Sequence, residues 1–136
     1  MSATASSISA TASKARELGY WIATVSITAL FAVPGVALLA RVPHFTEDMS
    51  HLGYPGYFLA ILGVWKVLGA AIVLAPRLPR LKEWAYAGMI FDATTAAISR
   101  AALDDGVVKI AFPIVIAAIV MASWALRPPT RRLQAN

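Results

Sequence analysis

A single lysine in the middle of an apolar stretch constrains the fold of this chain more than any other feature. Residues 54–75 read YPGYFLAILGVWKVLGAAIVLA, and Lys66 is the only charged residue among them. A helix of about 20 apolar residues crosses the hydrocarbon core of a bilayer, which is about 30 Å thick. A charge at that depth is costly in lipid, so such residues face other helices and have a partner. The sequence therefore predicts a transmembrane helix whose Lys66 points into a helix bundle.

The composition also indicates a membrane protein. Of the 136 residues, 59% are hydrophobic and only 14% are charged, whereas a soluble domain has about 25% charged residues. The chain has no cysteine, which excludes disulfides and thiolate metal sites. The net charge of +5 comes from short basic clusters beside the apolar runs. That pattern is typical of membrane topology signals, and we expect no nucleic-acid partner.

Four apolar runs predict an all-α fold, an integral membrane four-helix bundle with up-down-up-down topology. We expect its helices at about 20–40, 55–75, 84–102 and 107–126, within a domain that covers 20–126. Residues 1–19 are small and polar and have little to bury, so they are predicted to form a flexible N-terminal tail. Residues 127–136 form a basic C-terminal tail.

The first apolar run is too long for a cleaved signal peptide. Residues 20–40 contain no charge and no evident A-x-A-like cleavage site, whereas signal h-regions have about 7 to 15 residues. We therefore expect a retained membrane anchor. Pro34 and Gly35 lie inside this run, where they are compatible with a packing bend or with a cavity opened by a kink.

The basic residues predict the orientation of the bundle. With four spans, one side of the membrane holds eight basic residues and the other holds three. The first set is Lys14, Arg16, Arg77, Arg80, Lys82, Arg127, Arg131 and Arg132, and the second is Arg41, Arg100 and Lys109. Positive charge favours the cytoplasmic side, so both termini are expected in the cytoplasm.

The longest polar connection, residues 41–53, contains both histidines of the chain. His44 and His51 lie seven residues apart, a spacing that matches no zinc motif, so we expect no metal site. A short amphipathic or turn segment at the membrane interface is favoured instead, with His51 helping to cap the helix that follows.

The depth of two charges in the membrane identifies a partner for Lys66. Lys66 lies about nine residues, or about 14 Å at 1.5 Å per residue, from the inner end of its helix. Asp92 lies about nine residues beyond Glu83 on the next helix, and therefore at the same depth. The short segment 76–83 makes these two helices antiparallel neighbours. We expect Lys66 and Asp92 to form an ion pair.

Polar side chains at helical spacing extend this pair into a candidate ligand-binding site, which comprises Lys66, Asp92, Thr95, Ser99 and Thr28. Two interpretations stay open. The pair fixes helix register without forming a site, or it polarises a small cavity that receives the head of a lipid-soluble molecule. The sequence contains no GxSxG, HExxH or phosphate-loop motif, so catalytic residues stay unassigned and enzymatic activity stays open.

Several motifs in residues 54–102 resemble those of a known family. They are the YPxY opening at Tyr54, Pro55 and Tyr57, the LGxWKxLGA core at 62–70, the PRLKEWAYAG turn at 79–88, and Phe91-Asp92. With these motifs the chain resembles the DoxX-like family of small bacterial four-helix membrane proteins. The resemblance implies a multi-pass protein of the bacterial cytoplasmic (inner) membrane.

The resemblance implies two classes of function. The family takes its name from a membrane subunit of a thiosulfate:quinone oxidoreductase, which implies a quinone as cofactor or ligand, or a place in a membrane redox complex. More distant relatives act as assembly chaperones, which implies a non-enzymatic assembly factor or structural subunit with a purely structural Lys-Asp pair. The expected partners are the lipid bilayer and either another membrane protein or a second copy of the chain.

Overall fold

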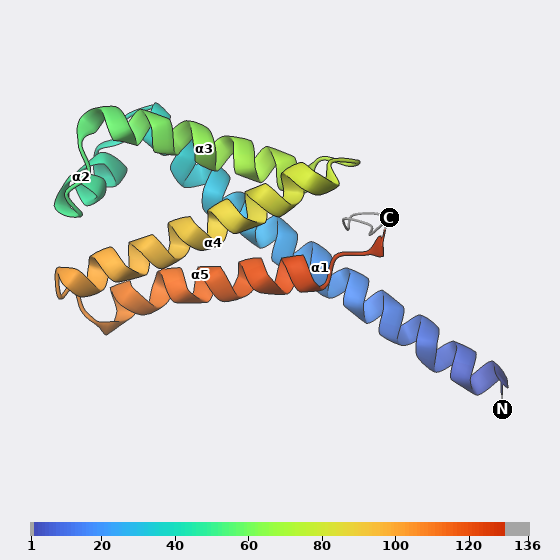
Figure 1. Cartoon of the computed structure of the whole chain (residues 1–136). Helices are drawn as coiled ribbons and strands as arrows, with labels where there is room; N and C mark the ends of the chain where they lie inside the picture. The colour runs from blue at the N-terminus through green and yellow to red at the C-terminus, as the bar shows by residue number, and fades with distance from the viewer. Residues whose placement is uncertain (1, 130–136) are drawn as a thin grey trace.

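The computed structural model of the chain describes residues 2–129 and shows an all-helical protein. Within this range the helices are α1 (Ser2–Leu39), α2 (Pro43–His51), α3 (Gly56–Leu74), α4 (Pro79–Ala102) and α5 (Val107–Ala125) (Figure 1). The described residues contain no strand, which confirms the prediction of an all-α fold. The C-terminal residues 130–136, which include most of the predicted basic tail, lie outside the described residues.

The four long helices pack as two pairs, α1 with α3 and α4 with α5. The largest contacts are between α1 and α3 and between α4 and α5, and α1 also packs against α5. In Figure 1, α3 and α4 meet near their connecting turn and diverge towards α2. The buried core comprises Ile27, Phe31, Ala70, Val73, Tyr86, Met89 and Val120. Among consecutive long helices, α3 and α4 make the smallest contact.

Three helices of the described chain are long and apolar enough to cross a membrane. The candidate spans are Ala3–Leu39, Gly56–Leu74 and Val107–Ala125. The remaining predicted span, 84–102, corresponds to α4. This helix is long enough but not apolar enough, because charged residues interrupt it. These residues are Arg80, Lys82, Glu83, Asp92 and Arg100. The predicted four-span bundle is therefore supported in its three apolar helices only.

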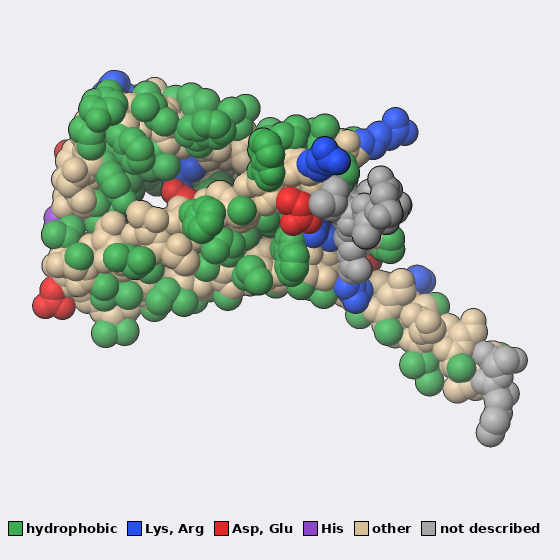
Figure 2. Space-filling model, in the orientation of Figure 1, with side chains coloured by type: hydrophobic (Ala, Val, Ile, Leu, Met, Phe, Trp, Pro, Cys, Tyr) green, Lys and Arg blue, Asp and Glu red, His purple; other side chains and the backbone are tan. Residues whose placement is uncertain are grey.

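The outward surface of the bundle is strongly apolar. Large hydrophobic side chains are exposed on every long helix, among them Val33 on α1, Trp65 on α3, Phe91 on α4 and Val115 on α5. Figure 2 shows hydrophobic side chains over much of the visible face of the bundle. A soluble monomer rarely exposes so large an apolar surface. The surface fits contact with lipid.

The first helix begins much earlier than the sequence indicated. It starts at Ser2 and not near residue 20, so residues 2–19 of the predicted tail are helical. Residues 3–18 are exposed and extend away from the bundle (Figure 1). Alanine has the highest helix propensity, and once a packed helix exists each added residue needs no new nucleation. Local propensity therefore continues the helix where tertiary packing has ended.

Two glycines set the closest approach of α1 and α3. A Cβ on Gly63 would lie 2.9 Å from both the Gly35 carbonyl oxygen and Leu39 Cγ. A Cβ on Gly35 would lie 3.0 Å from Lys66 Cβ. Small residues allow helix backbones to approach this closely, and α1 stays helical through Pro34. The Pro34-Gly35 pair thus serves close packing, and it holds the helix turn that carries Lys66 against α1.

Replacing Gly63 by alanine tests this crossing. The added methyl group has no room, so Gly63→Ala is expected to reduce the free energy of unfolding by about 2 kcal/mol, the usual cost of overpacking. The measurement is thermal unfolding in lipid discs followed by circular dichroism.

The matched control is Gly88→Ala on α4, where an added Cβ would meet no atom of the described residues within 4 Å. Both changes gain the same helix propensity, so the control is expected to leave stability unchanged or raised. Equal stability of the two variants would contradict a close crossing at Gly63.

Candidate functional site

Lys66 and Asp92 form the ion pair that the depth arithmetic predicts. Lys66 Nζ on α3 donates a hydrogen bond to Asp92 Oδ2 on α4 over 2.6 Å. The side chains are 14% and 25% exposed. Lys66 Nζ also lies 4.8 Å from the centre of the Phe31 ring on α1, within the range of a cation–π contact. Three helices thus contribute to the environment of one ammonium group.

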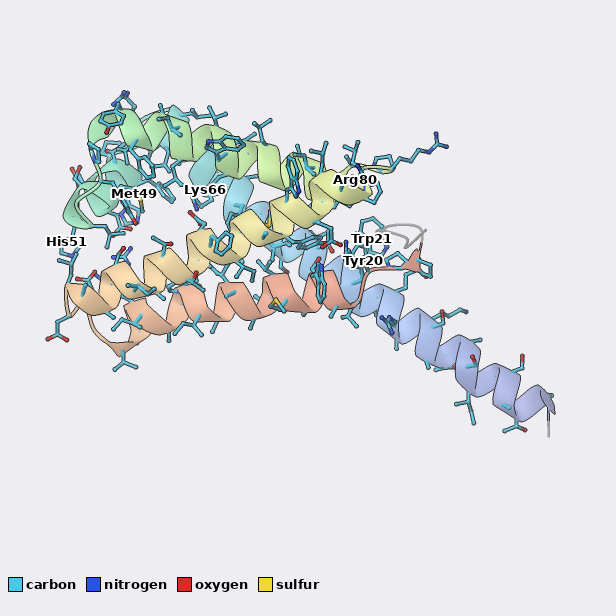
Figure 3. All side chains as sticks on the ribbon, in the orientation of Figure 1. Tyr20, Trp21, Met49, His51, Lys66 and Arg80 are labelled. Carbon is cyan, nitrogen blue, oxygen red and sulfur yellow. The ribbon has the colours of Figure 1, made fainter. Side chains whose placement is uncertain are left out.

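The divergence of α3 and α4 leaves a groove beside this pair, with a volume of about 390 Å³. Figure 2 shows the hollow between the two helices, with blue and red side chains inside it, and Figure 3 shows Lys66 directed into this gap. Among the described residues that line the groove, Lys66 and Asp92 alone carry charge. The others are Phe31, Met49, Leu52, Tyr54, Phe58, Leu62, Trp65, Gly69, Gly88, Met89, Phe91, Thr95 and Ala96.

Different residues line the two ends of the groove and its side between the helices. We call the end of the groove near the α3–α4 turn its inner end. There Gly69 faces Met89, and a Cβ on the glycine would lie 3.6 Å from the methionine methyl carbon. At the opposite end, the outer end, Met49 of α2 lines the groove. Two aromatic residues of the lining, Trp65 on α3 and Phe91 on α4, are 67% and 70% exposed. The open side of the groove therefore faces the surface on which lipid tails are expected to lie.

An ion-pair cluster lies at the outer end of the groove. Arg100 of α4 pairs with Asp48 of α2, and over 3.1 Å with Asp105 of the α4–α5 turn. His51 of α2 lies 2.7 Å from the same Asp105. The hydrogen bond with His51 contributes most to lowering the pKa of Asp105, and Arg100 lowers it further against the opposing effect of desolvation.

The role predicted for His51 is wrong. His51 is the last residue of α2, and the first turn of α3 has no side-chain cap. The imidazole is hydrogen-bonded to Asp105, 54 positions further along the chain. A local capping argument could not anticipate a partner on the α4–α5 turn. The predicted short segment at the membrane interface corresponds to α2.

The structure brings together most, but not all, of the predicted site residues. Thr95 lines the groove with Lys66 and Asp92. Ser99 lies one turn further out, and its hydroxyl is 3.2 Å from that of Tyr54, a groove residue. Thr28 is not among the lining residues, and its hydroxyl donates a hydrogen bond to the Thr24 carbonyl of its own helix. Phe31, three residues further along α1, occupies the place expected of Thr28.

A second polar cluster, which the sequence did not indicate, connects α1, α4 and α5. The Ser123 hydroxyl lies 2.7 Å from that of Thr24 and 2.8 Å from that of Tyr86, and all three side chains are buried. These hydroxyls satisfy one another, so they stabilise the interface and leave no group directed at a ligand. Hydroxyl residues within apolar runs are the signal that could have found them.

The charges near the inner end of α4 have partners too. Lys82 is buried and donates to the carbonyl oxygen of Ile72 over 3.0 Å. Glu83 pairs with Arg127 over 2.7 Å and accepts a hydrogen bond from Trp124. Asp92 and Arg100 also have ion-pair partners, so every charged residue of α4 except Arg80 has a polar contact described here. Arg80 is exposed and is the second residue of the helix.

A family model described as the DoxX-like family matches residues 22–123. The chain belongs to the DoxX-like family. The matched range contains the whole groove, including Lys66 and Asp92, and parts of all the long helices. Together with the three apolar helices, it identifies a DoxX-like membrane protein. No curated protein and no solved structure matches the chain.

Single and double replacements test how this DoxX-like protein depends on its central pair. Lys66→Leu and Asp92→Leu each leave one charge without its partner, and each is expected to reduce the free energy of unfolding by about 3 kcal/mol. The double variant removes both charges and is expected to lose clearly less. Unfolding in lipid discs measures all three.

A double variant as unstable as either single variant would contradict mutual dependence of the two charges. Thr28→Val provides the matched control, because it changes a hydroxyl that only bonds within α1.

Proposed function

We propose that this DoxX-like protein binds a quinone-like lipophilic molecule in the groove between α3 and α4. The polar head of the molecule would lie against Lys66 and Asp92. The observation that carries the proposal is one charged pair inside a groove that is otherwise lined almost entirely by apolar and aromatic side chains.

The size and lining of the groove support a small-molecule ligand. Ligand pockets commonly have volumes of about 300–1,000 Å³ and combine an apolar lining with a few polar groups that orient the ligand. The groove of about 390 Å³ has this character. Phe31, Phe58 and Trp65 contribute aromatic surface to the groove, which suits a flat headgroup.

The pair can recognise a carbonyl-bearing headgroup without losing its own hydrogen bond. A lysine ammonium group has three N–H donors, and Lys66 uses one of them for Asp92. A further N–H can donate to a quinone carbonyl oxygen, while the Asp92 carboxylate compensates the charge of Lys66. This geometry supports binding and orientation. It assigns no bond-breaking step to either residue.

The open side of the groove supports a ligand that comes from the membrane. The groove lies between α3, a candidate span, and α4, and exposed apolar side chains border it. A molecule dissolved in the bilayer can therefore enter sideways and leave its apolar tail among the lipids. A water-soluble metabolite would have no comparable route.

The proposed topology has four spans, with α4 crossing the membrane alongside the three apolar helices. The 24 residues of α4 extend about 36 Å at 1.5 Å per residue, enough for a bilayer core of about 30 Å. Its inner charges and Asp92 have partners within the bundle, which reduces their cost in lipid. The basic residues favour a bacterial inner membrane protein with both termini in the cytoplasm.

Identification of a bound molecule tests the proposal. The protein would be extracted directly into lipid discs, and its small molecules would be measured by mass spectrometry and absorbance. We expect a quinone or a similar lipophile at about one molecule per chain.

Gly88→Leu is the diagnostic variant. Gly88 lines the groove with free space at its Cβ position, so a leucine should fill the groove without breaking the central pair and reduce occupancy at least about tenfold. Gly56→Leu, at an open position outside the groove lining, is the matched control and should keep its ligand.

An empty parent protein, or equal occupancy in both leucine variants, would overturn the proposal. Co-purification of an empty protein with a larger membrane complex would favour the assembly-factor or structural-subunit interpretation, in which Lys66 and Asp92 only fix the register of α3 and α4.

A further inference from the structure

The short helix α2 is attached to the bundle differently from the other helices. None of its nine residues is buried. A residue with left-handed backbone conformation lies on each side of it, Arg41 with φ 56° and Gly53 with φ 90°. Turns of this kind define where the chain changes direction before and after the helix. α2 is thus a short rigid segment between two turns, without a core of its own.

One face of α2 nevertheless covers the groove. Met49 in α2 and Leu52 directly after it both line the outer end of the groove. Figure 3 shows the labelled Met49 on the side of α2 that faces the interior of the bundle. Both side chains are half-buried at this end of the groove. Their removal would extend the groove to the outer surface.

Charge pairs connect this covering segment to the far wall of the groove. Asp48 and His51 of α2 pair with Arg100 and Asp105, respectively, and Arg100 also pairs with Asp105. We call these four residues the Arg100 clasp. The Asp105 side chain is only 6% exposed, so its two partners largely replace water around it. The clasp connects α2 to α4 and to the α4–α5 turn through polar contacts.

We propose that α2 is a lid over the outer end of the groove and that the Arg100 clasp holds it closed. When the clasp opens, α2 turns about the segments at Arg41 and Gly53, and Met49 and Leu52 leave the groove. The lid would control the access of water to the head of an occupant that has entered sideways from the bilayer. In this respect the inference rests on the proposed function. Lid motion itself needs no occupant.

Thiol labelling measures lid opening directly, because the chain has no cysteine of its own. Met49 is half-buried in the closed structure, so a Met49→Cys reporter in the full-length protein in lipid discs would react faster with a water-soluble maleimide when α2 leaves the groove. In this background, Asp48→Asn and Arg100→Gln each remove part of the clasp, and each should speed labelling at least about tenfold.

Two controls isolate the clasp from other effects. Lys109→Gln removes an exposed positive charge near the same end of the bundle and should leave the labelling rate of Met49→Cys unchanged. A Val120→Cys reporter in the fully buried core should stay unreactive in every clasp variant, because the lid moves without unfolding of the bundle.

Two results would overturn the lid. One is an unchanged labelling rate at Met49→Cys in both clasp variants. The other is an equal increase at Val120→Cys, which would mean that the whole bundle opens. Both results are independent of ligand occupancy, so failure of the lid is distinguishable from failure of the proposed lipophile site, which an empty groove in the parent protein would show.

Discussion

The ion pair between Lys66 and Asp92 is the interaction on which the arrangement of α3 and α4 depends. Each charge would be costly in the hydrocarbon core without the other, so the two helices must keep these positions within hydrogen-bond distance. Beyond the region of their connecting turn, α3 and α4 diverge towards α2. The pair therefore holds the two walls of the groove together at mid-depth and also supplies its polar group.

The other helices position this pair from both sides. On one side, the Gly35–Gly63 crossing brings α1 against the helix turn of α3 that carries Lys66, and Phe31 of α1 then lies under the ammonium group. On the other side, α4 is fixed to α5 by apolar packing and by the hydrogen bonds of Ser123. The groove is the space left between two well-packed pairs of helices.

The sequence predicts the features that follow from helix geometry alone. Rise per residue and a short connecting turn place Lys66 beside Asp92, and length and hydropathy identify α1, α3 and α5 as apolar helices. Features that depend on helix rotation or on distant partners were missed. Thr28 is not among the groove residues and bonds to the Thr24 carbonyl of its own helix, and the partner of His51 lies on a turn 54 positions away. The extent of α1 was missed because an exposed helix leaves no amphipathic pattern.

In the proposed complex, the ammonium group of Lys66 contacts a lipophile in the groove. The most direct measurement is a titration of the protein in lipid discs with a short-chain quinone, followed by the ¹⁵N signals of the lysine side chains. We predict a saturable shift of the Lys66 signal. The Lys82 signal should stay unchanged, because Lys82 is buried near the α3–α4 turn and bonded to the Ile72 carbonyl. An unshifted Lys66 signal at saturating quinone would contradict this contact.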